Sequence, residues 1–404
     1  MSSESASSEK TLLSPWNERA GALTRKVGIC DCTLREGEQA AGAAFGPMTR
    51  AVLARKIAAL GVPQIQVGYP GTSQEDREMA EMLSSLGLGA HLEGIAMVHV
   101  DGWQQHVEDT VRSGVDIVSM QFGISDIRLR DVLHMSRAEA LSVIERAVKT
   151  AQDLGAKTTS FSPTDTTRAD PDFTLTVYEK LEEWGINRVR VLDSMGAASP
   201  AGFRALVSAV RKTVGIPIGV HCHNDYGLGL ANLIAAVEEG VDFVDVVANG
   251  LGERTGNVAL DEAVLVLAHL YGQDALVPLD ALFPFAKEVE ELIRVPISPF
   301  KPITGANAFA HQLDNHVRGV IRNPRVYEPY DPSLVGNRRR FPLGRLSGRH
   351  VVGLYLAEWG VDIDTVDLDA LVAELRSRAV ETGGEVETEW LRTHIDGHRR
   401  VGNG

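Results

Sequence analysis

Cysteine and long hydrophobic runs are both scarce in this sequence, and each shortage excludes a class of protein. Three cysteines among 404 residues are too few for a disulfide framework and favour a reducing compartment. No segment approaches the roughly 20 consecutive apolar residues that a membrane-spanning helix needs. We therefore expect a cytoplasmic protein with no membrane partner. Its 44% hydrophobic content is enough for a large core and more than one domain.

Positive charge is scarce as well. The chain has 40 Lys and Arg against 54 Asp and Glu, which gives a net charge of -14. Its densest cationic run is Arg338-Arg339-Arg340, which is far shorter than the basic patches that bind phosphate backbones. We therefore expect no nucleic-acid partner.

Short apolar runs alternate regularly with longer amphipathic segments. The predicted strand and helix pairs are 27–32 with 49–60, 64–68 with 74–86, 91–99 with 103–113, 116–121 with 137–154, 157–162 with 172–184, 188–192 with 200–214, 217–221 with 228–239, and 243–248 with 258–271. Eight such pairs match a parallel (β/α)8 barrel, or TIM barrel, in number and size. A doubly wound open sheet is the main alternative, but the first strand is not followed by a G-x-G-x-x-G turn.

The rest of the chain divides into parts at either side of the barrel. We predict a flexible N-terminal segment (1–25), a catalytic barrel (26–275), and a linker with C-terminal subdomains for dimerisation and the active site (276–404). The last part should be mostly helical, with a helix over 280–294, a Pro-rich linker over 296–302 and a helix pair over 364–382. We expect no regulatory domain beyond Gly404.

A His-x-His pair follows the seventh predicted strand, in residues 221–225 (HCHND). Side chains two apart on a strand face the same way, so both imidazoles converge on one point. Neutral imidazole is a common ligand of divalent metals, although a hydrogen-bonded pair of histidines would show the same spacing. The catalytic groups of such barrels lie at the C-terminal ends of strands. Other polar segments fall at these ends too: 31–39, 162–165, 193–194 and 249–257.

Three of these segments resemble the signatures of one enzyme family. Residues 31–39 (DCTLREGEQ), 221–225 (HCHND) and 250–257 (GLGERTGN) are similar to motifs of the metal-dependent Claisen-condensing barrel enzymes. These are the homocitrate, isopropylmalate and citramalate synthases, with 3-hydroxy-3-methylglutaryl-CoA lyase as a more distant relative. Residues 305–311 (GANAFAH) and 343–349 (LGRLSGR) resemble the C-terminal subdomains of the synthases, so the resemblance extends from Val27 to Arg349.

The resemblance implies a metal site. It makes Glu36, His221 and His223 the ligands of one divalent metal, with Asn257 as a fourth contact. These donors suit zinc, manganese, cobalt or magnesium, so the identity of the metal stays open. The metal would polarise the keto carbon of a 2-oxo acid, and Arg35 would stabilise the oxyanion that forms when a carbon nucleophile adds.

The resemblance also implies an acyl-CoA co-substrate, acetyl-CoA, and a catalytic base from a partner subunit. Residues 313–319 (LDNHVRG) resemble the His motif of the synthases, and residues 326–329 (VYEP) resemble their Tyr motif. His316 and Tyr327 are therefore the candidates, and a homodimer is expected. Asp314-Asn315 stand where the family commonly has Ser-Gly.

Four positions bear on the 2-oxo acid. Gln66 and Thr164 stand where the family commonly carries Glu, and Arg128 and Arg130 lie in the loop after strand four. Losing two carboxylates and adding two guanidiniums favours a substrate with a second anionic group, because Arg pairs bidentately with carboxylate and phosphate oxygens. The alternative is that both arginines face solvent.

We therefore expect a synthase that joins acetyl-CoA to an anionic 2-oxo acid, most similar to homocitrate synthase. Gln39 and Ser194 complete the expected substrate contacts. Oxaloacetate or a phosphono or phosphino analogue of pyruvate remains open as the substrate, as does an isopropylmalate or citramalate synthase. Two classes that differ in chemistry also stay open: a lyase of the 3-hydroxy-3-methylglutaryl-CoA type, and a catalytically silent binding protein.

Overall fold

The computed structural model describes residues 13–17, 23 and 25–400, so most of the predicted flexible segment 1–25 lies outside the described residues. The chain forms two compact units. Among the described residues, the barrel unit comprises 23 and 25–296, and the C-terminal unit comprises 297–400 together with 13–17. Residues 276–296, which the sequence analysis grouped with the C-terminal part, therefore belong to the barrel unit by their contacts.

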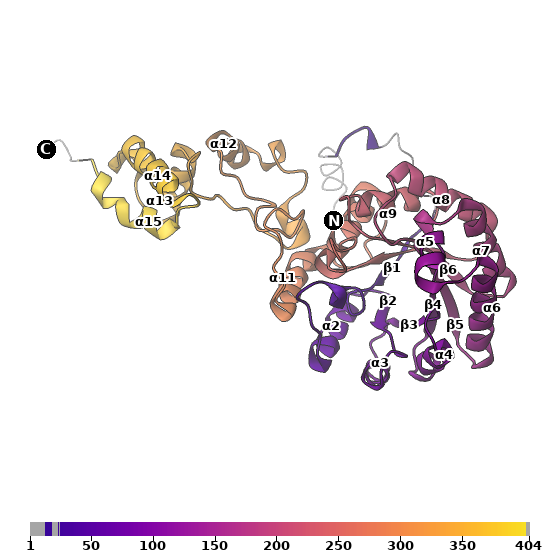
Figure 1. The fold of residues 1–404 in the computed structure, drawn as a ribbon. Coiled ribbons are helices and arrows are strands. Elements are labelled where there is room, and N and C mark those ends of the chain that lie inside the picture. The colour runs from indigo at the N-terminus through magenta and orange to yellow at the C-terminus, as the bar shows by residue number, and fades with distance from the viewer. Residues whose placement is uncertain (1–12, 18–22, 24, 401–404) are drawn as a thin grey trace. The chain divides into compact units, whose positions relative to one another are not determined.

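Eight parallel strands form a closed barrel in sequence order, with β1 paired to β8. The strands are β1 (Gly28–Asp31), β2 (Gln64–Gly68), β3 (His91–Met97), β4 (Ile117–Gly123), β5 (Thr158–Thr164), β6 (Arg188–Asp193), β7 (Ile218–Cys222) and β8 (Phe243–Val246). Figure 1 shows helices packed around these strands. The predicted (β/α)8 barrel is confirmed.

The helices that connect the strands begin and end close to the predicted bounds. They are α2 (Pro47–Ala59), α3 (Gln74–Ser85), α4 (Trp103–Arg112), α6 (Arg137–Asp153), α7 (Pro171–Glu183), α8 (Pro200–Thr213), α9 (Gly229–Glu238) and α10 (Leu260–Leu265). Ser136 accepts a hydrogen bond from the Glu139 backbone N–H while the Glu139 side chain accepts one from Ser136, a capping box that fixes the start of α6. The apolar core lies between strands and helices, with Leu53 and Ile57 of α2 fully buried.

The inside of the barrel is polar, unlike the aliphatic layers that usually fill this fold. Gly219 leaves space for the ring of Phe243, because a Cβ at Gly219 would lie 2.1 Å from Phe243 Cε2. The guanidinium of Arg190, itself 1% exposed, packs 4.9 Å from the centroid of that ring. The Arg190 side chain donates hydrogen bonds to both Glu93 and Asp245. The barrel interior is thus held by paired charges.

The helix predicted over 280–294 is confirmed: it begins as a 3-10 turn, Leu279–Ala281, and continues as α11 (Leu282–Ile293). The helix pair over 364–382 is wrong: this stretch holds one α-helix, α14 (Leu368–Thr382), after a 3-10 turn at Ile363–Thr365. The Asp362 side chain accepts from the Asp364 backbone N–H and stabilises the turn instead of a helix.

The C-terminal unit is mostly helical, as expected. Its α-helices are α12 (Asp314–Arg322), α13 (Arg349–Glu358), α14 and α15 (Thr388–His394). An apolar core joins them, with Val351, Val352, Leu371 and Leu375 at 0% exposure. Pro296 to Pro302 contains no described helix, which confirms the predicted break. In the described part of both units, none of the helices is long and apolar enough to span a membrane.

Candidate active site at the barrel rim

Three predicted metal ligands converge at the C-terminal ends of β1 and β7. The ligand atoms of Glu36, His221 and His223 all lie within 4.8 Å of one another. His221 Nε2 lies 3.9 Å from Glu36 Oε2, and His223 Nε2 lies 3.6 Å from Glu36 Oε1. All three side chains are buried. One carboxylate and two imidazoles on a common centre are a donor set for a divalent metal.

Asn257 stands at the same point. It pairs with His223 in an isolated antiparallel bridge and is 4% exposed. Among the described residues, Asn257 Oδ1 and Nδ2, Glu36 Oε1 and His223 Nδ1 are buried without a hydrogen-bond partner. Buried polar atoms without partners are costly, so their clustering here fits a group that these residues bind.

Glycines give Asn257 its space. Gly252 has φ of 143°, and a Cβ there would lie 2.2 Å from Asn257 Nδ2 and 3.2 Å from Glu36 Cγ. Gly256 has φ of 82°, and a Cβ there would lie 1.9 Å from the carbonyl oxygen of Gly250. The glycines of the GLGERTGN motif are therefore required by the close approach of this loop to the ligands.

The protonation states of this centre suit metal binding. Burial by itself would raise the pKa of Glu36, but the charges of Arg35, His221 and His223 outweigh it and hold that pKa at about 2. Burial, with the charge of His221, lowers the pKa of His223 to about 3. Near neutral pH Glu36 is ionised and His223 is neutral, which are the forms that ligate metals.

A carboxylate that no sequence motif indicated, Asp245, orients His221. Asp245 Oδ2 lies 3.1 Å from His221 Nδ1, so a proton on Nδ1 leaves Nε2 free to face Glu36. Asp245 also accepts from Arg190 Nε at 3.0 and 3.1 Å. Arg190 in turn bonds Glu93, which Arg188 also contacts at 3.0 Å. Charged residues within the buried strands β3, β6 and β8 were the signal in the sequence, because buried charges must be paired.

A second group of ligand-type atoms, from Cys30, Cys32 and Asp245, also lies within 4.8 Å. Burial raises the pKa of both thiols, so they remain protonated, and Asp245 is already bound by Arg190 and His221. This group therefore has the character of barrel packing, not of a metal site. All three cysteines of the chain are free and buried.

Arg35 lies beside the three ligands and is 7% exposed. Its Nε and one terminal nitrogen donate to Gln66 Oε1 at 3.0 and 2.8 Å, and its other terminal nitrogen pairs with Glu36. Gln39 Nε2 lies 3.5 Å from Glu36 Oε2 and 3.4 Å from the Tyr69 hydroxyl. The structure thus brings Arg35, Gln66 and Gln39 together at the ligand cluster.

Arg128 and Thr164 meet at the tops of β4 and β5. The Arg128 stem packs over Gly123, where a Cβ would lie 2.6 Å from Arg128 Cδ and 3.5 Å from Thr164 Oγ1. The Thr164 hydroxyl is buried with no partner among the described residues. Arg128 Nε lies 4.0 Å from Asp165 Oδ2, but Arg168 already holds Asp165 with two hydrogen bonds of 2.8 Å. The terminal nitrogens of Arg128 therefore remain available to a ligand.

Arg130 behaves differently. Its side chain is 71% exposed, and it donates to Asp131 at 2.5 and 2.7 Å. Arg128 is the last residue of a short helix that was not predicted, α5 (Asp126–Arg128), and Arg130 lies in the π-helical turn Leu129–Leu133 that follows it. The geometry favours Arg128 over Arg130 as a substrate contact, and the expectation of a solvent-facing arginine fits Arg130.

Ser194, Asp193 and Arg254 hold the loops of the rim in place. Ser194 Oγ accepts from the Asp165 backbone N–H at 2.8 Å. Arg254 pairs with Asp225 and also donates to the Ser194 carbonyl at 2.8 Å. Asp193 accepts from Thr167, from two backbone N–H groups and from Asn232. These contacts tie the loops after β5, β6, β7 and β8 into one rim.

His316 and Tyr327 lie together in the C-terminal unit. Their rings stack with centroids 4.2 Å apart. Gly319 makes this possible, because a Cβ there would lie 2.5 Å from Tyr327 Cε2. The next residue, Glu328, is buried and bonds His311 at 3.0 Å and Arg339 at 2.6 and 2.8 Å. The two predicted catalytic side chains are thus held side by side on a firmly anchored segment.

Comparisons with known proteins cover both units. Residues 26–285 match the HMGL-like family, and residues 303–382 match the homocitrate synthase post-HMGL domain-like family. The homocitrate synthase AksA of Methanothermobacter thermautotrophicus is 34% identical over 90% of this chain and 92% of its own length. The 2-isopropylmalate synthase of Sulfolobus acidocaldarius is 38% identical over 90% of this chain and 93% of its own.

Two further similarities concern a third kind of synthase and a lyase. The (R)-citramalate synthase CimA of Methanocaldococcus jannaschii is 34% identical over 87% of this chain and 70% of its own length. Among solved structures, hydroxymethylglutaryl-CoA lyase from Pseudomonas aeruginosa superposes with a TM-score of 0.59 at 22% identity, covering 68% of this chain and 95% of that one. At this identity the similarity to the lyase concerns the fold alone.

Proposed function

The chain belongs to the family of homocitrate, 2-isopropylmalate and citramalate synthases, and from this premise we propose that it joins acetyl-CoA to a 2-oxo acid. A new carbon–carbon bond forms between the acetyl methyl carbon and the keto carbon. The keto oxygen takes up a proton, and water cleaves the thioester to release CoA and a 2-hydroxy-2-carboxymethyl acid. The observation that carries this proposal is the convergence of Glu36, His221 and His223 beside the buried Arg35.

We propose that these residues, with Asn257, hold a divalent metal. The buried atoms without partners on Asn257, Glu36 and His223 support this. When bound, such a metal supplies Lewis-acid polarisation of a 2-oxo group. The donor set suits manganese, magnesium, cobalt or zinc.

Arg35 is the residue proposed to stabilise the developing oxyanion. Its guanidinium is buried, and Gln66 fixes its direction through two hydrogen bonds. A preorientated cation at a site shielded from water stabilises a forming negative charge more than a mobile surface cation does. Gln66 therefore acts as a positioning residue for Arg35.

His316 and Tyr327 are proposed to remove the methyl proton of acetyl-CoA within a homodimer, each pair serving the site of the partner subunit. Their stacked rings and the anchored Glu328 support a joint role. Mixing inactive Arg35→Ala and His316→Ala subunits should restore part of the activity, because one site in each heterodimer then has both groups. No recovery after verified subunit exchange would contradict a base that acts across the dimer.

We propose further that the 2-oxo acid carries a second anionic group, as in homocitrate synthase. Arg128 has terminal nitrogens available, Thr164 offers a buried hydroxyl without a partner, and Gln66 brings no negative charge. 2-Oxoglutarate, oxaloacetate and a phosphono or phosphino analogue of pyruvate share this chemistry. Cleavage of the 3-hydroxy-3-methylglutaryl-CoA type is the second candidate, but the match of residues 303–382 to the post-HMGL domain favours a synthase.

One assay tests both the condensation and the preference for a 2-oxo acid with a second anionic group. Purified protein with acetyl-CoA and a panel of 2-oxo acids is followed by release of free thiol, with His221→Ala as the inactive control. Substrates with a second anion should exceed 2-oxoisovalerate and pyruvate by at least about tenfold in kcat/KM, because a desolvated charged hydrogen bond is worth about 1.5–3 kcal/mol. Arg128→Ala should remove most of this preference, whereas Arg130→Ala, the matched control, should keep it. A preference for 2-oxoisovalerate would overturn the second-anion proposal and leave the condensation intact.

A further inference from the structure

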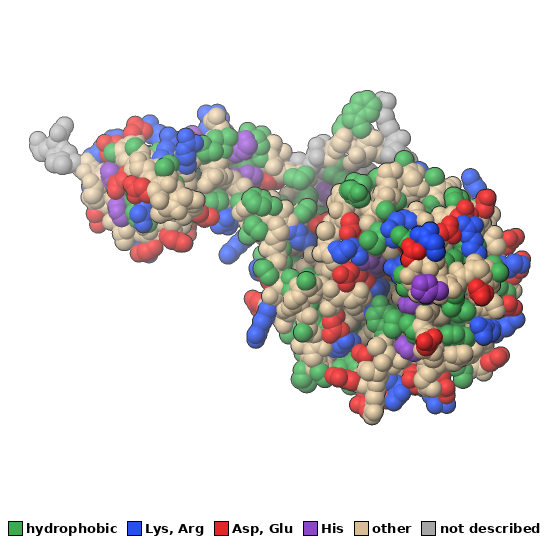
Figure 2. All heavy atoms as spheres, in the orientation of Figure 1, with side chains coloured by type: hydrophobic (Ala, Val, Ile, Leu, Met, Phe, Trp, Pro, Cys, Tyr) green, Lys and Arg blue, Asp and Glu red, His purple; other side chains and the backbone are tan. Residues whose placement is uncertain are grey.

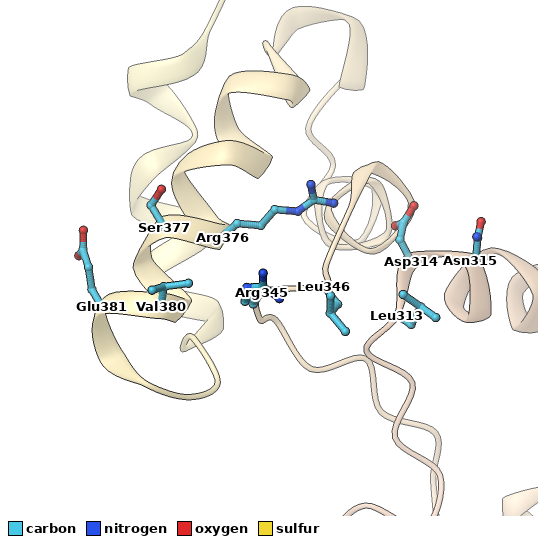
Figure 3. Close-up of a pocket in the computed structure, with 9 residues that line it drawn as sticks. All are labelled: Leu313, Asp314, Asn315, Arg345, Leu346, Arg376, Ser377, Val380 and Glu381. Atoms are coloured by element: carbon cyan, nitrogen blue, oxygen red, sulfur yellow. The ribbon is translucent and has the colours of Figure 1, made fainter.

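The C-terminal unit has a groove of about 800 Å³ between the start of α12, the loop before α13 and one face of α14. Figure 3 shows the side chains that line it, among them the guanidiniums of Arg345 and Arg376 and the carboxylates of Asp314 and Glu381. These two pairs of charges cancel, so the lining selects neither an anion nor a cation. A more specific arrangement lies in the barrel, behind the candidate metal ligands.

Thr33 lies in the turn that leads from β1 to Glu36. This turn is closed by its own backbone, because the N–H groups of Arg35 and Glu36 both donate to the Cys32 carbonyl, at 3.1 and 2.7 Å. Thr33 is fully buried, so its side chain meets neither solvent nor substrate. Its hydroxyl oxygen accepts from the Ala248 backbone N–H at 2.9 Å. Thr33 therefore joins the turn that carries Glu36 to the segment that follows β8.

The segment that follows β8 leads to Asn257, the fourth proposed ligand. It contains the 3-10 turn Ala248–Gly250, whose last carbonyl accepts from the Asn257 backbone N–H at 3.2 Å. The hydrogen bond of Thr33 is thus attached at one end to the turn of Glu36 and at the other to the loop of Asn257. A shift of the two segments against each other would change the separation of these two ligands.

Asp31, the last residue of β1, holds Thr33 in place. Its Oδ1 accepts from the Thr33 backbone N–H at 2.8 Å. The Asp31 side chain is fully buried, and its Oδ2 has no partner among the described residues. Burial raises the pKa of Asp31 to about 7, and the backbone N–H and hydroxyl of Thr33 are the groups that oppose this rise. A buried carboxyl with one unpaired oxygen is costly, so its place here fits a role in holding the turn and not in stabilising the fold.

We propose that Thr33 is a positioning residue for the metal centre. Its hydroxyl fixes the turn of Glu36 against the loop of Asn257 before any metal binds. Asp31 orients Thr33 for this contact. The proposal rests on the metal site of the proposed function. Ligands that are already in place lose less conformational freedom when the metal binds, so the contact should be visible in the metal affinity itself.

Titration of the chelator-treated full chain with Mn²⁺ tests this proposal without any turnover. Thr33→Val keeps the shape of the side chain and removes its hydroxyl, so the Kd for Mn²⁺ should rise by about tenfold. Thr33→Ser restores the hydroxyl and should bind within about twofold of the unaltered chain. Asp31→Ala should weaken binding by itself but add nothing to the loss in Thr33→Val, because Asp31 acts through Thr33.

Thr166→Val is the matched control. Thr166 is 2% exposed, and its hydroxyl likewise joins two strand ends, donating to the Pro163 carbonyl at 2.6 Å and accepting from the Leu192 backbone N–H at 3.4 Å. It lies at the ends of β5 and β6, which carry none of the proposed ligands. Urea denaturation of the metal-free proteins should show similar losses of stability in Thr33→Val and Thr166→Val, whereas only Thr33→Val should lose Mn²⁺ affinity. Thr33→Ala gives the same comparison if Thr33→Val does not fold.

Unchanged Mn²⁺ affinity in Thr33→Val would overturn the proposal, as would equal weakening in Thr33→Val and Thr166→Val, which marks a loss of stability alone. Failure of Thr33→Ser to keep the affinity would do the same. Thiol release with acetyl-CoA and a 2-oxo acid separates the positioning role from the proposed function. Turnover with a Mn²⁺ affinity that does not depend on Thr33 refutes the positioning role and leaves the synthase standing. Mn²⁺ binding that depends on Thr33, without turnover on any 2-oxo acid, does the reverse.

Discussion

The two units of the chain solve the problem of a stable interior in opposite ways. In the barrel unit, the space enclosed by the strands holds Arg190, Glu93 and Asp245, all nearly without exposure. In the C-terminal unit, the helices enclose a cluster of buried apolar side chains such as Leu371 and Val352. Figure 2 shows acidic and basic side chains interspersed on the visible surfaces of both units, so the contrast concerns their interiors alone.

The physical cost of the two solutions differs. Burying a charge costs several kcal/mol unless it is paired and fully hydrogen-bonded, whereas burying an apolar side chain is favourable without any partner. In the barrel these charges are paired. Asp245 accepts from Arg190 and contacts His221, so the ion pair with Arg190 holds Asp245 in the position that orients this candidate metal ligand. The polar interior therefore serves the site, while the apolar core serves only the fold.

The largest expected effect comes from breaking the barrel network. Arg190→Met should lower the free energy of unfolding by about 3–5 kcal/mol, because two buried carboxylates lose their main partner. Urea denaturation followed by hydrogen exchange of barrel peptides measures this loss. The triple variant Arg190→Met, Glu93→Gln, Asp245→Asn should recover part of it, since no uncompensated charge remains. A loss under about 1 kcal/mol in the single variant would show that the pairing is not structural.

The next largest loss of stability is expected in the apolar core of the C-terminal unit, and it should be confined to that unit. Leu371→Ala removes a fully buried side chain of α14 and should cost roughly 2–5 kcal/mol, as large-to-small core changes do. Hydrogen exchange should increase in peptides of residues 343–395, with metal affinity at the barrel unchanged. Equal loss of protection in the barrel strands would contradict the independence of the two cores.

A smaller effect is expected at Asp245, where a change should weaken metal binding through the orientation of His221 and not through the stability of the fold. Asp245→Asn should weaken binding of a divalent metal by roughly 10–100-fold, because the charge that holds the His221 ring and its tautomer is lost. Titration of chelator-treated protein with Mn²⁺ gives this affinity. Asp193→Asn is the matched control: Asp193 is equally buried but holds a loop instead of a histidine. Equal weakening in both variants would remove the specific role of Asp245.

The smallest effect is expected at a surface pair. Arg204 pairs with Glu238 on the outside of the barrel, and its side chain is 44% exposed. Arg204→Gln should change the free energy of unfolding by no more than about 1 kcal/mol, because solvent screens an exposed ion pair. The same denaturation experiment, repeated at high salt, checks it. A loss as large as that of Arg190→Met would mean that burial does not determine how much an ion pair contributes to the free energy of unfolding.

Much of the fold could be predicted because its signals are local. Alternation of strand and helix patterns located β2 to the residue and most other barrel elements to within two or three residues of their bounds. The helices α12, α13 and α15 were not predicted. Of these, α12 buries only Val317 and Val320 and shows no long apolar stripe. The 3-10 turn at Ile363–Thr365 was mistaken for part of a helix pair, because its cap by the Asp362 side chain has no periodic apolar pattern to set it apart from a helix start.

For the site, the sequence by itself determined which residues stand at the ends of β1 and β7, because strand ends of a parallel barrel meet at one rim. It also supplied the residues of the motifs that distinguish this family. Only the tertiary structure decided that Arg128 and not Arg130 turns toward Thr164, and that Asp245 holds His221. The partners of Arg190 are 97 and 55 residues away in the chain. A pairing across a barrel depends on strand register and on the inward direction of each side chain, and no local pattern encodes either.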